Sequence, residues 1–474
     1  MGDRVYKLKK PVDLGFLDFT TREARERICH REVELNRRLA PDVYLGVLDV
    51  VSDGEPCDHL VVMRRMPADR RLSTLVVDGD PRGAEWIHGL ARLLADFHAR
   101  AERSPVIDRS ASADAVRRNW DDNLAAMVPF EGAGLDEDLS RRVATLVHRY
   151  LDGRGPLFEQ RIATGQVCDG HGDLQAADIF CLEDGPRVLD CIEFSDELRH
   201  GDVMADLGFL AMDLERLGAP ELADQLVEEY DEFAAEVCPS SLLHHYVAYR
   251  AHVRCKVNCL RSSQMESTAR DEVLRAASDL LELAAAHLER ARVRLVLVGG
   301  LPGTGKTTVA EGLAERSGWT VLRSDVIRKE LAGLPPDAPA DAAYGEGIYG
   351  PETTDRVYQE LRDRARVALG LGESVILDAS WSNEGERVRA RELAEACVAD
   401  VAELVCRVPA ETAAARIRER RARGRDASDA TTEVAERMAA TADDWPEAAV
   451  VDTGATPDEA VDAAWEELRG EPEV

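Results

Sequence analysis

Residues 294–308 read RLVLVGGLPGTGKTT, and they decide the fold of the C-terminal part of the chain. The opening RLVLV is a continuous apolar run, which is typical of a strand buried on both faces of a parallel sheet. Further apolar runs follow at 319–322, 374–377, 401–408 and 449–452, with helical spacing between them. Alternation of strands and helices predicts an α/β domain built on a parallel sheet.

The glycines after the first run have the spacing G-x-x-x-x-G-K-[ST] of a phosphate-binding P-loop. Glycine tolerates positive φ, so backbone N–H groups can surround phosphate oxygens, and the next helix adds partial positive charge at its N-terminus. We expect Lys306 to reach the β- and γ-phosphates and the Thr307 hydroxyl to ligate Mg²⁺. The predicted cofactors are ATP and Mg²⁺, and the predicted nucleotide-binding residues are Gly300, Pro302, Gly303, Thr304, Gly305, Lys306, Thr307 and Thr308. A glycine-rich turn without a ligand is the alternative.

Two aspartates follow the next two strands. In LRSDVIRKEL, Asp325 comes at the carboxyl end of the second strand, where open α/β sheets bind substrates. Its carboxylate can accept a proton from a hydroxyl nucleophile, and Arg328 lies one helical turn further on. An N-cap role for Asp325 is the compatible alternative. VILDAS ends the third strand with Asp378, which we expect to hold Mg²⁺ through water.

The stretch ARIRERRARGR contains six arginines, from Arg416 to Arg425, around the single acidic residue Glu419. Such a group of arginines suits a lid that closes on the transferred phosphoryl group. A solvated helix face is the alternative interpretation. The loops 331–350 and 380–387 are expected to build the acceptor pocket.

Residues 293–474 resemble the P-loop small-molecule kinases, the relatives of gluconate kinase, chloramphenicol phosphotransferase, polynucleotide kinase and zeta toxin. The stretches that carry the resemblance are GGLPGTGKTT, RSDVIRKEL, VILDAS and RIRERRARGRDASDA. The resemblance implies that Asp325 is the hydroxyl-activating aspartate. With the P-loop lysine and the arginine one turn after Asp325, the expected catalytic residues of this part are Asp325, Lys306 and Arg328. It also implies that lid arginines contact the nucleotide, namely Arg416, Arg420 and Arg423. It leaves the acceptor open.

The first part of the chain begins with β-rich runs at 4–8, 43–51 and 59–66 and a helical pattern at 21–39, and it ends in almost wholly helical spacing at 203–290. HGDLQAADIF, VLDCIEF and HGDVMADLGFL resemble the aminoglycoside phosphotransferase-like kinases, in the branch that is fused to a P-loop kinase. The resemblance implies Asp173 as the catalytic-loop base, Asp190 as a Mg²⁺ ligand and Asp206 as a structural residue. It also implies an ion pair between a strand lysine and a helix glutamate, here Lys7 and Glu32.

Two departures from that family pattern affect the expected role of this part. Asp178 stands where the motif has Asn; its oxygens can still ligate Mg²⁺, but it adds negative charge beside Asp173 and Asp190. Only six residues precede Lys7, whereas a Gly-rich loop with its two strands takes roughly 30 residues. Either the true start lies upstream or this lobe is shortened. We therefore expect a scaffold or substrate-binding role here and phosphotransfer in the C-terminal part.

The chain is long enough for two domains, which we place at 1–290, kinase-like, and 291–474, a P-loop kinase. The net charge is −31, divided as −18 before residue 291 and −13 after it. An acidic surface repels a phosphate backbone, so nucleic acid is an unexpected partner. The sequence contains no run of 18 consecutive apolar residues, so a membrane span is not expected. Its ten cysteines are scattered along the chain, which favours reduced thiols in a cytoplasmic protein.

These patterns predict an ATP-dependent kinase whose acceptor is the hydroxyl of a small molecule. Two alternatives stay open. One is a nucleotide-regulated binding or scaffold protein without turnover of an acceptor, and the other is a kinase of nucleotides or RNA ends. The oligomeric state is not predicted.

Overall fold

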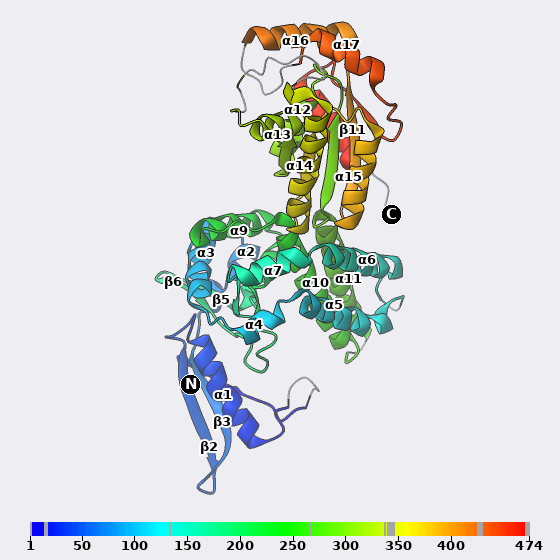
Figure 1. Cartoon of the computed structure of the whole chain (residues 1–474). Coiled ribbons are helices and arrows are strands. Elements are labelled where there is room, and N and C mark those ends of the chain that lie inside the picture. The colour runs from blue at the N-terminus through cyan, green and yellow to red at the C-terminus, as the bar shows by residue number, and fades with distance from the viewer. Residues whose placement is uncertain are drawn as a thin grey trace. The chain divides into compact units, whose positions relative to one another are not determined.

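The computed structural model describes residues 2–13, 18–132, 134–265, 267–335, 338, 347–423 and 430–469. The chain forms two compact units (Figure 1). Unit 1 comprises Met1–Leu151 and Leu157–Ala291, and unit 2 comprises Asp152–Pro156 and Arg292–Val474. Each unit combines helices with β-sheet, so the fold class is α/β and α+β, as predicted.

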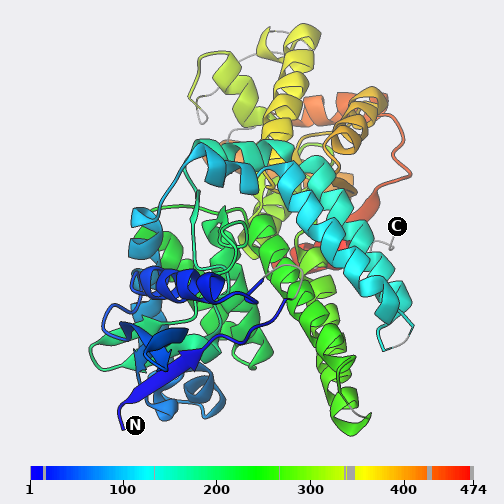
Figure 2. The same cartoon turned by 90° about the horizontal axis from the view of Figure 1, so that it is seen from below.

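Unit 1 begins with a three-stranded antiparallel sheet in the order β1-β3-β2, formed by β1 (Arg4–Leu8), β2 (Tyr44–Ser52) and β3 (Glu55–Arg64). The helix α1 (Arg22–Asn36) packs against β2 and β3, as Figure 2 shows from below. It begins at an N-cap threonine, Thr21, whose side chain accepts a hydrogen bond from the Ala24 N–H. The buried face of α1 contributes Cys29 and Val33 to a small core under the sheet.

The rest of unit 1 is mainly helical. Its helices are α2 (Leu72–Val77), α3 (Gly83–Arg100), α4 (Pro105–Ser110), α5 (Ala113–Met127), α6 (Glu137–Gly153), α7 (Gly155–Ala163), α8 (Val203–Arg216), α9 (Pro220–Ala234), α10 (Ser240–Ser262) and α11 (Ser267–Arg290). Two short antiparallel pairs, β4 (Val167–Asp169) with β7 (His200–Asp202) and β5 (Ile179–Leu182) with β6 (Gly185–Val188), flank the predicted catalytic loop. The helical spacing predicted for 203–290 is thus observed as four helices.

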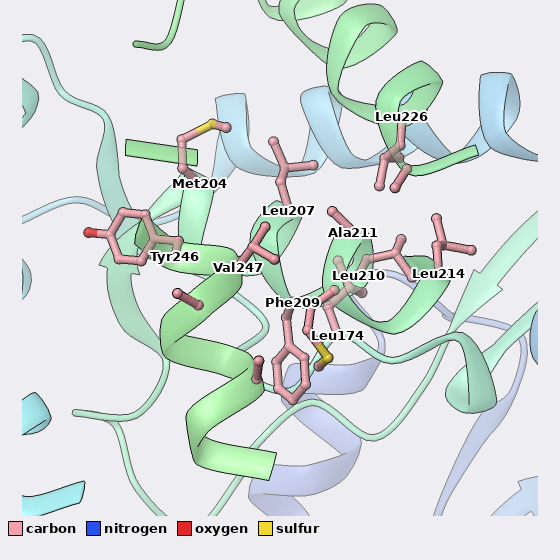
Figure 3. Close-up of a cluster of buried hydrophobic side chains, with 14 of the residues drawn as sticks. Leu174, Met204, Leu207, Phe209, Leu210, Ala211, Leu214, Leu226, Tyr246 and Val247 are labelled. Carbon is pink, nitrogen blue, oxygen red and sulfur yellow. The ribbon is translucent and has the colours of Figure 1, made fainter. Parts of the chain in front are cut away.

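The centre of unit 1 is the contact between α8 and α10, where Leu207, Phe209, Tyr246 and Val247 pack together (Figure 3). Gly208 makes this close approach possible, because a Cβ added there would lie 3.0 Å from Tyr246 Cβ and 3.0 Å from the Val247 backbone N. Nearly every residue of α8 from Val203 to Leu214 is buried, which explains its all-round apolar pattern.

Unit 2 contains the predicted parallel sheet. Five strands lie in the order β12-β11-β8-β10-β9, and every neighbouring pair is parallel. The strands are β8 (Arg294–Gly299), β9 (Thr320–Arg323), β10 (Val375–Asp378), β11 (Asp400–Arg407) and β12 (Ala449–Asp452), each within one residue of the predicted apolar run. The connections are α12 (Lys306–Ser317), α13 (Ser324–Leu331), α14 (Pro351–Gly370), α15 (Glu384–Ala396), α16 (Ala410–Arg423), α17 (Thr432–Thr441) and α18 (Pro457–Arg469).

Helices cover both faces of this sheet. Successive residues of β8 point to opposite faces, so Leu295 and Leu297 join a core with α13, α14 and α15, whereas Val296 and Val298 join a core with α12 and α18. Burial on both faces is the reason that β8 reads as an unbroken apolar run. Within the described part of the chain, no helix is both long enough and apolar enough to span a bilayer.

Candidate active site

The predicted P-loop connects β8 to α12. Three of its glycines have positive φ, namely Gly300 (140°), Gly303 (83°) and Gly305 (87°), and Gly305 is the N-cap of α12. A Cβ at Gly303 would lie 2.5 Å from the carbonyl oxygen of Ala413, so a side chain could not be added without displacing backbone. The loop therefore has the backbone conformation for which the glycines were predicted.

Neighbouring segments hold this loop in place. The Thr304 hydroxyl donates to the carbonyl oxygen of Leu301 (2.8 Å), and the carbonyl oxygen of Thr304 accepts from the Thr453 hydroxyl (2.5 Å). Thr453 follows β12 and is 5% exposed. A role for Thr453 was not predicted, although its position directly after a parallel strand could have indicated one.

Thr307 and Asp378 lie together at the start of α12. The Thr307 hydroxyl donates to Asp378 Oδ2 (2.7 Å), and the Asp378 side chain is buried. Burial raises the pKa of Asp378, while Lys306 and the Thr307 hydrogen bond oppose that rise. Its second oxygen, Oδ1, is buried and accepts no hydrogen bond from the described residues. An orphaned buried carboxylate oxygen beside a hydroxyl fits a divalent cation.

A cavity of about 690 Å³ opens beside the P-loop. It is lined by Pro302 and Lys306 from the loop, Asp325 from α13, residues of α14 and α17, and the segment after β10. The predicted pocket segments take part, through Tyr349 from one and Ser380 from the other. Half of the first segment lies outside the described residues, namely 336, 337 and 339–346.

Asp325 lies in the first turn of α13, and Arg323 occupies the N-cap position before it. The alternative N-cap role of Asp325 is therefore wrong. Arg328 is largely buried, and its Nη1 donates to the carbonyl oxygen of Ile348 (2.9 Å) and to the Thr354 hydroxyl (3.2 Å). These bonds hold the guanidinium at the wall of the same cavity.

The predicted lid arginines lie on α16. Arg416 donates from Nη2 to the carbonyl oxygen of Thr453 (2.8 Å), and its Nη1 would lie 3.5 Å from a Cβ added at Gly305. Arg416 thus reaches the P-loop. Arg420 is half-buried on the same helix. The side chain of Arg423 and residues 424–429 lie outside the described residues, and Thr308 lies exposed on α12.

In unit 1 the predicted lysine–glutamate pair forms. Lys7 Nζ lies 2.9 Å from Glu32 Oε1 and 2.6 Å from Asp190 Oδ1, and Glu32 is fully buried. Burial alone would lower the pKa of Lys7, but the charges of Glu32 and Asp190 raise it above its ordinary value. Lys9 Nζ lies 2.6 Å from Glu32 Oε2, and Lys9 also pairs with Glu193. The second lysine was not predicted as a partner of Glu32.

Asp206 shapes the loop that carries Asp173. Its two carboxylate oxygens accept hydrogen bonds from the backbone N–H groups of His171 (2.6 Å) and Gly172 (2.8 Å). Burial opposes ionisation of Asp206, but the hydrogen bond and charge of His98 together with the His171 N–H hold its pKa well below its ordinary value. The structural role expected of Asp206 is visible in these contacts.

Asp173, Asp178 and Asp190 act electrostatically on one another in unit 1. Burial raises the pKa of Asp178 to about 7, and the charges of Asp190 and Asp173 add to the shift. Burial also raises the pKa of Asp173. Burial alone would raise the pKa of Asp190, but the charge and hydrogen bond of Lys7, together with the charge of Lys9, hold this pKa below its ordinary value. The charge of Asp190 thus raises the pKa of both other carboxylates that the sequence singled out.

Comparison with known proteins adds family information. A model of the family described as an AAA domain matches residues 295–444. Two proteins match almost the whole chain at 41% identity over 466 residues, covering 98% of this chain and 92% of the relative. They are the uncharacterized proteins Rv2004c of Mycobacterium tuberculosis and Mb2027c of Mycobacterium bovis.

Solved structures with similarity include three kinases. A sugar kinase from Janibacter sp. is 20% identical, with 38% of this chain and 96% of that chain covered and a TM-score of 0.28. The APS kinase CysC of Mycobacterium tuberculosis, in complex with AMPPNP and APS, is 19% identical, with 38% and 99% covered and a TM-score of 0.28. A choline/ethanolamine kinase family protein from Mesorhizobium loti is 16% identical, with 60% and 87% covered and a TM-score of 0.37.

The whole-chain match extends through both units, and the AAA-domain match lies within unit 2, where the P-loop is found. The chain belongs to the same family as the mycobacterial protein Rv2004c, with an AAA domain in its C-terminal unit.

Proposed function

We propose that the protein is an ATP-dependent kinase and that unit 2 transfers the γ-phosphoryl group of ATP to a hydroxyl group of a small molecule. The observation that carries the proposal is the cavity beside the P-loop, which is lined by both Lys306 and Asp325. A nucleotide-binding ammonium and a candidate base thus face one space, which a molecule of metabolite size can enter. We assign residues 291–474 as the P-loop kinase domain and 1–290 as the kinase-like domain.

The residues that would hold the nucleotide are those of the P-loop, 300–308, with Arg416 reaching it from α16. Thr307 and Asp378 would hold Mg²⁺, since their oxygens lie together and one Asp378 oxygen has no hydrogen-bond partner among the described residues. When bound, Mg²⁺ would supply positive charge that neutralises the phosphate oxygens.

The acceptor hydroxyl would be oriented by Asp325, whose carboxylate accepts its proton. Lys306 and Arg416 would stabilise negative charge that develops on the transferred group. Arg328 is fixed by Ile348 and Thr354, so it presents a positive charge at a defined place in the acceptor cavity. The contribution of these residues is therefore positioning and electrostatic stabilisation, as phosphoryl transfer requires.

The test is the rate of ATP consumption and the affinity for Mg·ATP in two variants of the full chain, Lys306→Ala and Asp173→Ala. We expect Lys306→Ala to lose about 100-fold or more in turnover, because it removes a charge that stabilises the transition state. Asp173→Ala should retain most of the activity. Full activity in Lys306→Ala together with loss in Asp173→Ala would assign the chemistry to unit 1 instead.

A further inference from the structure

Three hydroxyl groups lie in a row on the wall of the cavity beside the P-loop. The hydroxyl of Tyr358, in α14, lies 3.1 Å from Ser380 Oγ, and Ser380 Oγ lies 3.3 Å from Ser382 Oγ. All three residues line the cavity. Tyr358 is buried, and the two serines, which follow β10, are half-buried. We call these three side chains the hydroxyl chain.

The backbone between the two serines is held in an unfavourable conformation. Trp381 has a φ of 52°, in the left-handed region that a bulky residue rarely adopts. Its N–H donates to the Tyr358 hydroxyl (3.3 Å), its carbonyl oxygen accepts from Arg387 Nη1 (2.8 Å), and its Nε1 donates to the carbonyl oxygen of Leu377 (3.1 Å). The surrounding structure therefore fixes this strained conformation, and strain retained in this way is typical of ligand-binding sites.

The hydroxyl chain has more protons than it can use internally. Each hydroxyl group donates one proton, and the two bonds within the chain use two of the three. The bond from Trp381 brings in a further N–H donor and takes up no hydroxyl proton. None of the three hydroxyl groups has another hydrogen-bond partner among the described residues. One hydroxyl proton at the cavity wall therefore lacks an acceptor in that part of the chain.

The charged side chains of the same lining balance one another. Among the described residues they are four cations and four carboxylates. Arg389 pairs with Glu386 (2.6 Å), and Arg437 pairs with Glu433 (2.7 Å). The others are Lys306, Arg328, Asp325 and Asp355. Because the charges sum to zero, hydrogen bonding is the more selective property of this wall.

We propose that the hydroxyl chain binds a second hydroxyl group of the acceptor, so that the substrate of unit 2 is a polyhydroxylated small molecule and not a simple alcohol. This inference rests on the proposed function and names the substrate class of the same site. A hydroxyl group both accepts and donates, so it takes the spare proton and donates its own to an oxygen of the chain. An alcohol without that group leaves the proton unpartnered, which a site of this kind disfavours.

The position of the hydroxyl chain suits this role. The carbonyl oxygen of Ser380 accepts a hydrogen bond from the Gly300 N–H (3.2 Å), which connects the chain to the P-loop. Asp325 lines the same cavity. An acceptor held by one hydroxyl at the chain can thus offer another to the Asp325 carboxylate, and two points of attachment orient it for transfer.

The test is the rate of ATP consumption by the full chain with erythritol, D-erythronate and 1-butanol, which share one carbon skeleton. Erythritol is a neutral polyol, D-erythronate is an acidic one, and 1-butanol has a single hydroxyl group. We expect kcat/KM for at least one polyol to exceed that for 1-butanol about tenfold or more. The two polyol arms then separate a neutral acceptor from an acidic one.

Variants of Ser382 locate the effect. Ser382→Ala should raise KM for the preferred polyol about fivefold, the loss of one hydrogen bond, while KM for Mg·ATP changes less than about twofold. Ser382→Thr keeps the hydroxyl and should restore the lower KM. Ser317→Ala is the matched control, because its hydroxyl donates to the carbonyl oxygen of Leu313 (2.7 Å) in α12, and it should leave KM unchanged.

The inference is overturned if 1-butanol is used as well as both polyols, or if Ser382→Ala behaves as Ser317→Ala does. In either case ATP consumption that depends on Lys306 would persist, so the kinase function itself would stand. ATP consumption that does not depend on Lys306 would instead contradict the proposed function, and the inference with it.

Discussion

At the scale of single residues, burial of charge marks the places where stability and function oppose each other. Asp378 is buried with one oxygen unpartnered among the described residues, and burial raises its pKa. Asp206 is equally buried, but two backbone N–H groups and His98 surround it, and its pKa is lowered. The second carboxylate is fully hydrogen-bonded within the fold, whereas the first keeps an unpartnered oxygen, which we propose ligates Mg²⁺.

Asp378→Asn should therefore raise the stability of the ligand-free protein while weakening Mg·ATP binding. Removing a buried charge that lacks full compensation stabilises by roughly 1 kcal/mol. Thermal unfolding with and without Mg·ADP measures both effects. Asp452→Asn, at the exposed end of strand β12 in the same sheet, should change neither. A variant that keeps the full Mg·ADP-induced shift in Tm would exclude Asp378 from the metal site.

Asp206→Asn should destabilise unit 1 by roughly 3 kcal/mol, because the amide replaces a charged acceptor of two backbone N–H groups. The folded pKa of Asp206 is lowered, so its contribution is present above the unfolded pKa and is lost as pH falls. Urea unfolding at pH 7 measures the difference. Asp224→Asn, exposed on α9, is the matched control and should be neutral within about 0.5 kcal/mol.

At the scale of elements, local sequence patterns predict which strands and helices form, whereas close contacts determine how far apart the helices pack. The strands of unit 2 follow directly from their apolar runs, since a strand covered on both faces excludes polar residues. The helices α8 and α10 also follow from their patterns, but their separation depends on one residue. Gly208 lies where a Cβ would meet Tyr246 and Val247.

Gly208→Ala should destabilise unit 1 by about 1–3 kcal/mol, because the added methyl group forces the two helices apart. The intrinsic helix propensity of alanine acts in the opposite direction, so a loss of stability would be due to packing. Gly201→Ala is the control, since its Cβ would lie 4.0 Å from the nearest side chain. Chemical unfolding of both variants decides the matter, and equal stabilities would contradict the packing argument.

At the scale of the whole molecule, the titrating groups are unevenly distributed. All 11 histidines fall between His30 and His287, so unit 2 contains none. Burial lowers the pKa of His171 to about 4, of His245 to about 3 and of His252 to about 4. These side chains are held neutral in the folded unit.

Unit 1 should consequently lose stability as pH falls from about 6.5 toward about 4. Unit 2, which contains no histidine, should keep its stability over this range. A histidine whose folded pKa is depressed binds protons more weakly in the folded state, so below its unfolded pKa of about 6.5 the unfolded chain is favoured. Hydrogen exchange at pH 7 and pH 5, corrected for intrinsic rates, measures this for each unit. His245→Gln should reduce the pH dependence, and His88→Gln, an exposed change, should not. Loss of protection in unit 2 first would contradict this account.

The sequence by itself determined the sheet of unit 2, the P-loop and the pairing of Lys7 with Glu32. The first two depend on local physics, namely apolar runs and glycines whose positive φ is required within a few residues, and the third was carried by a family pattern. Only the tertiary structure decided which distant groups complete each site. Thr453, directly after the last strand, supports the P-loop, and Lys9 shares Glu32 with Lys7. Such contacts join residues far apart in the chain, and no local spacing encodes them.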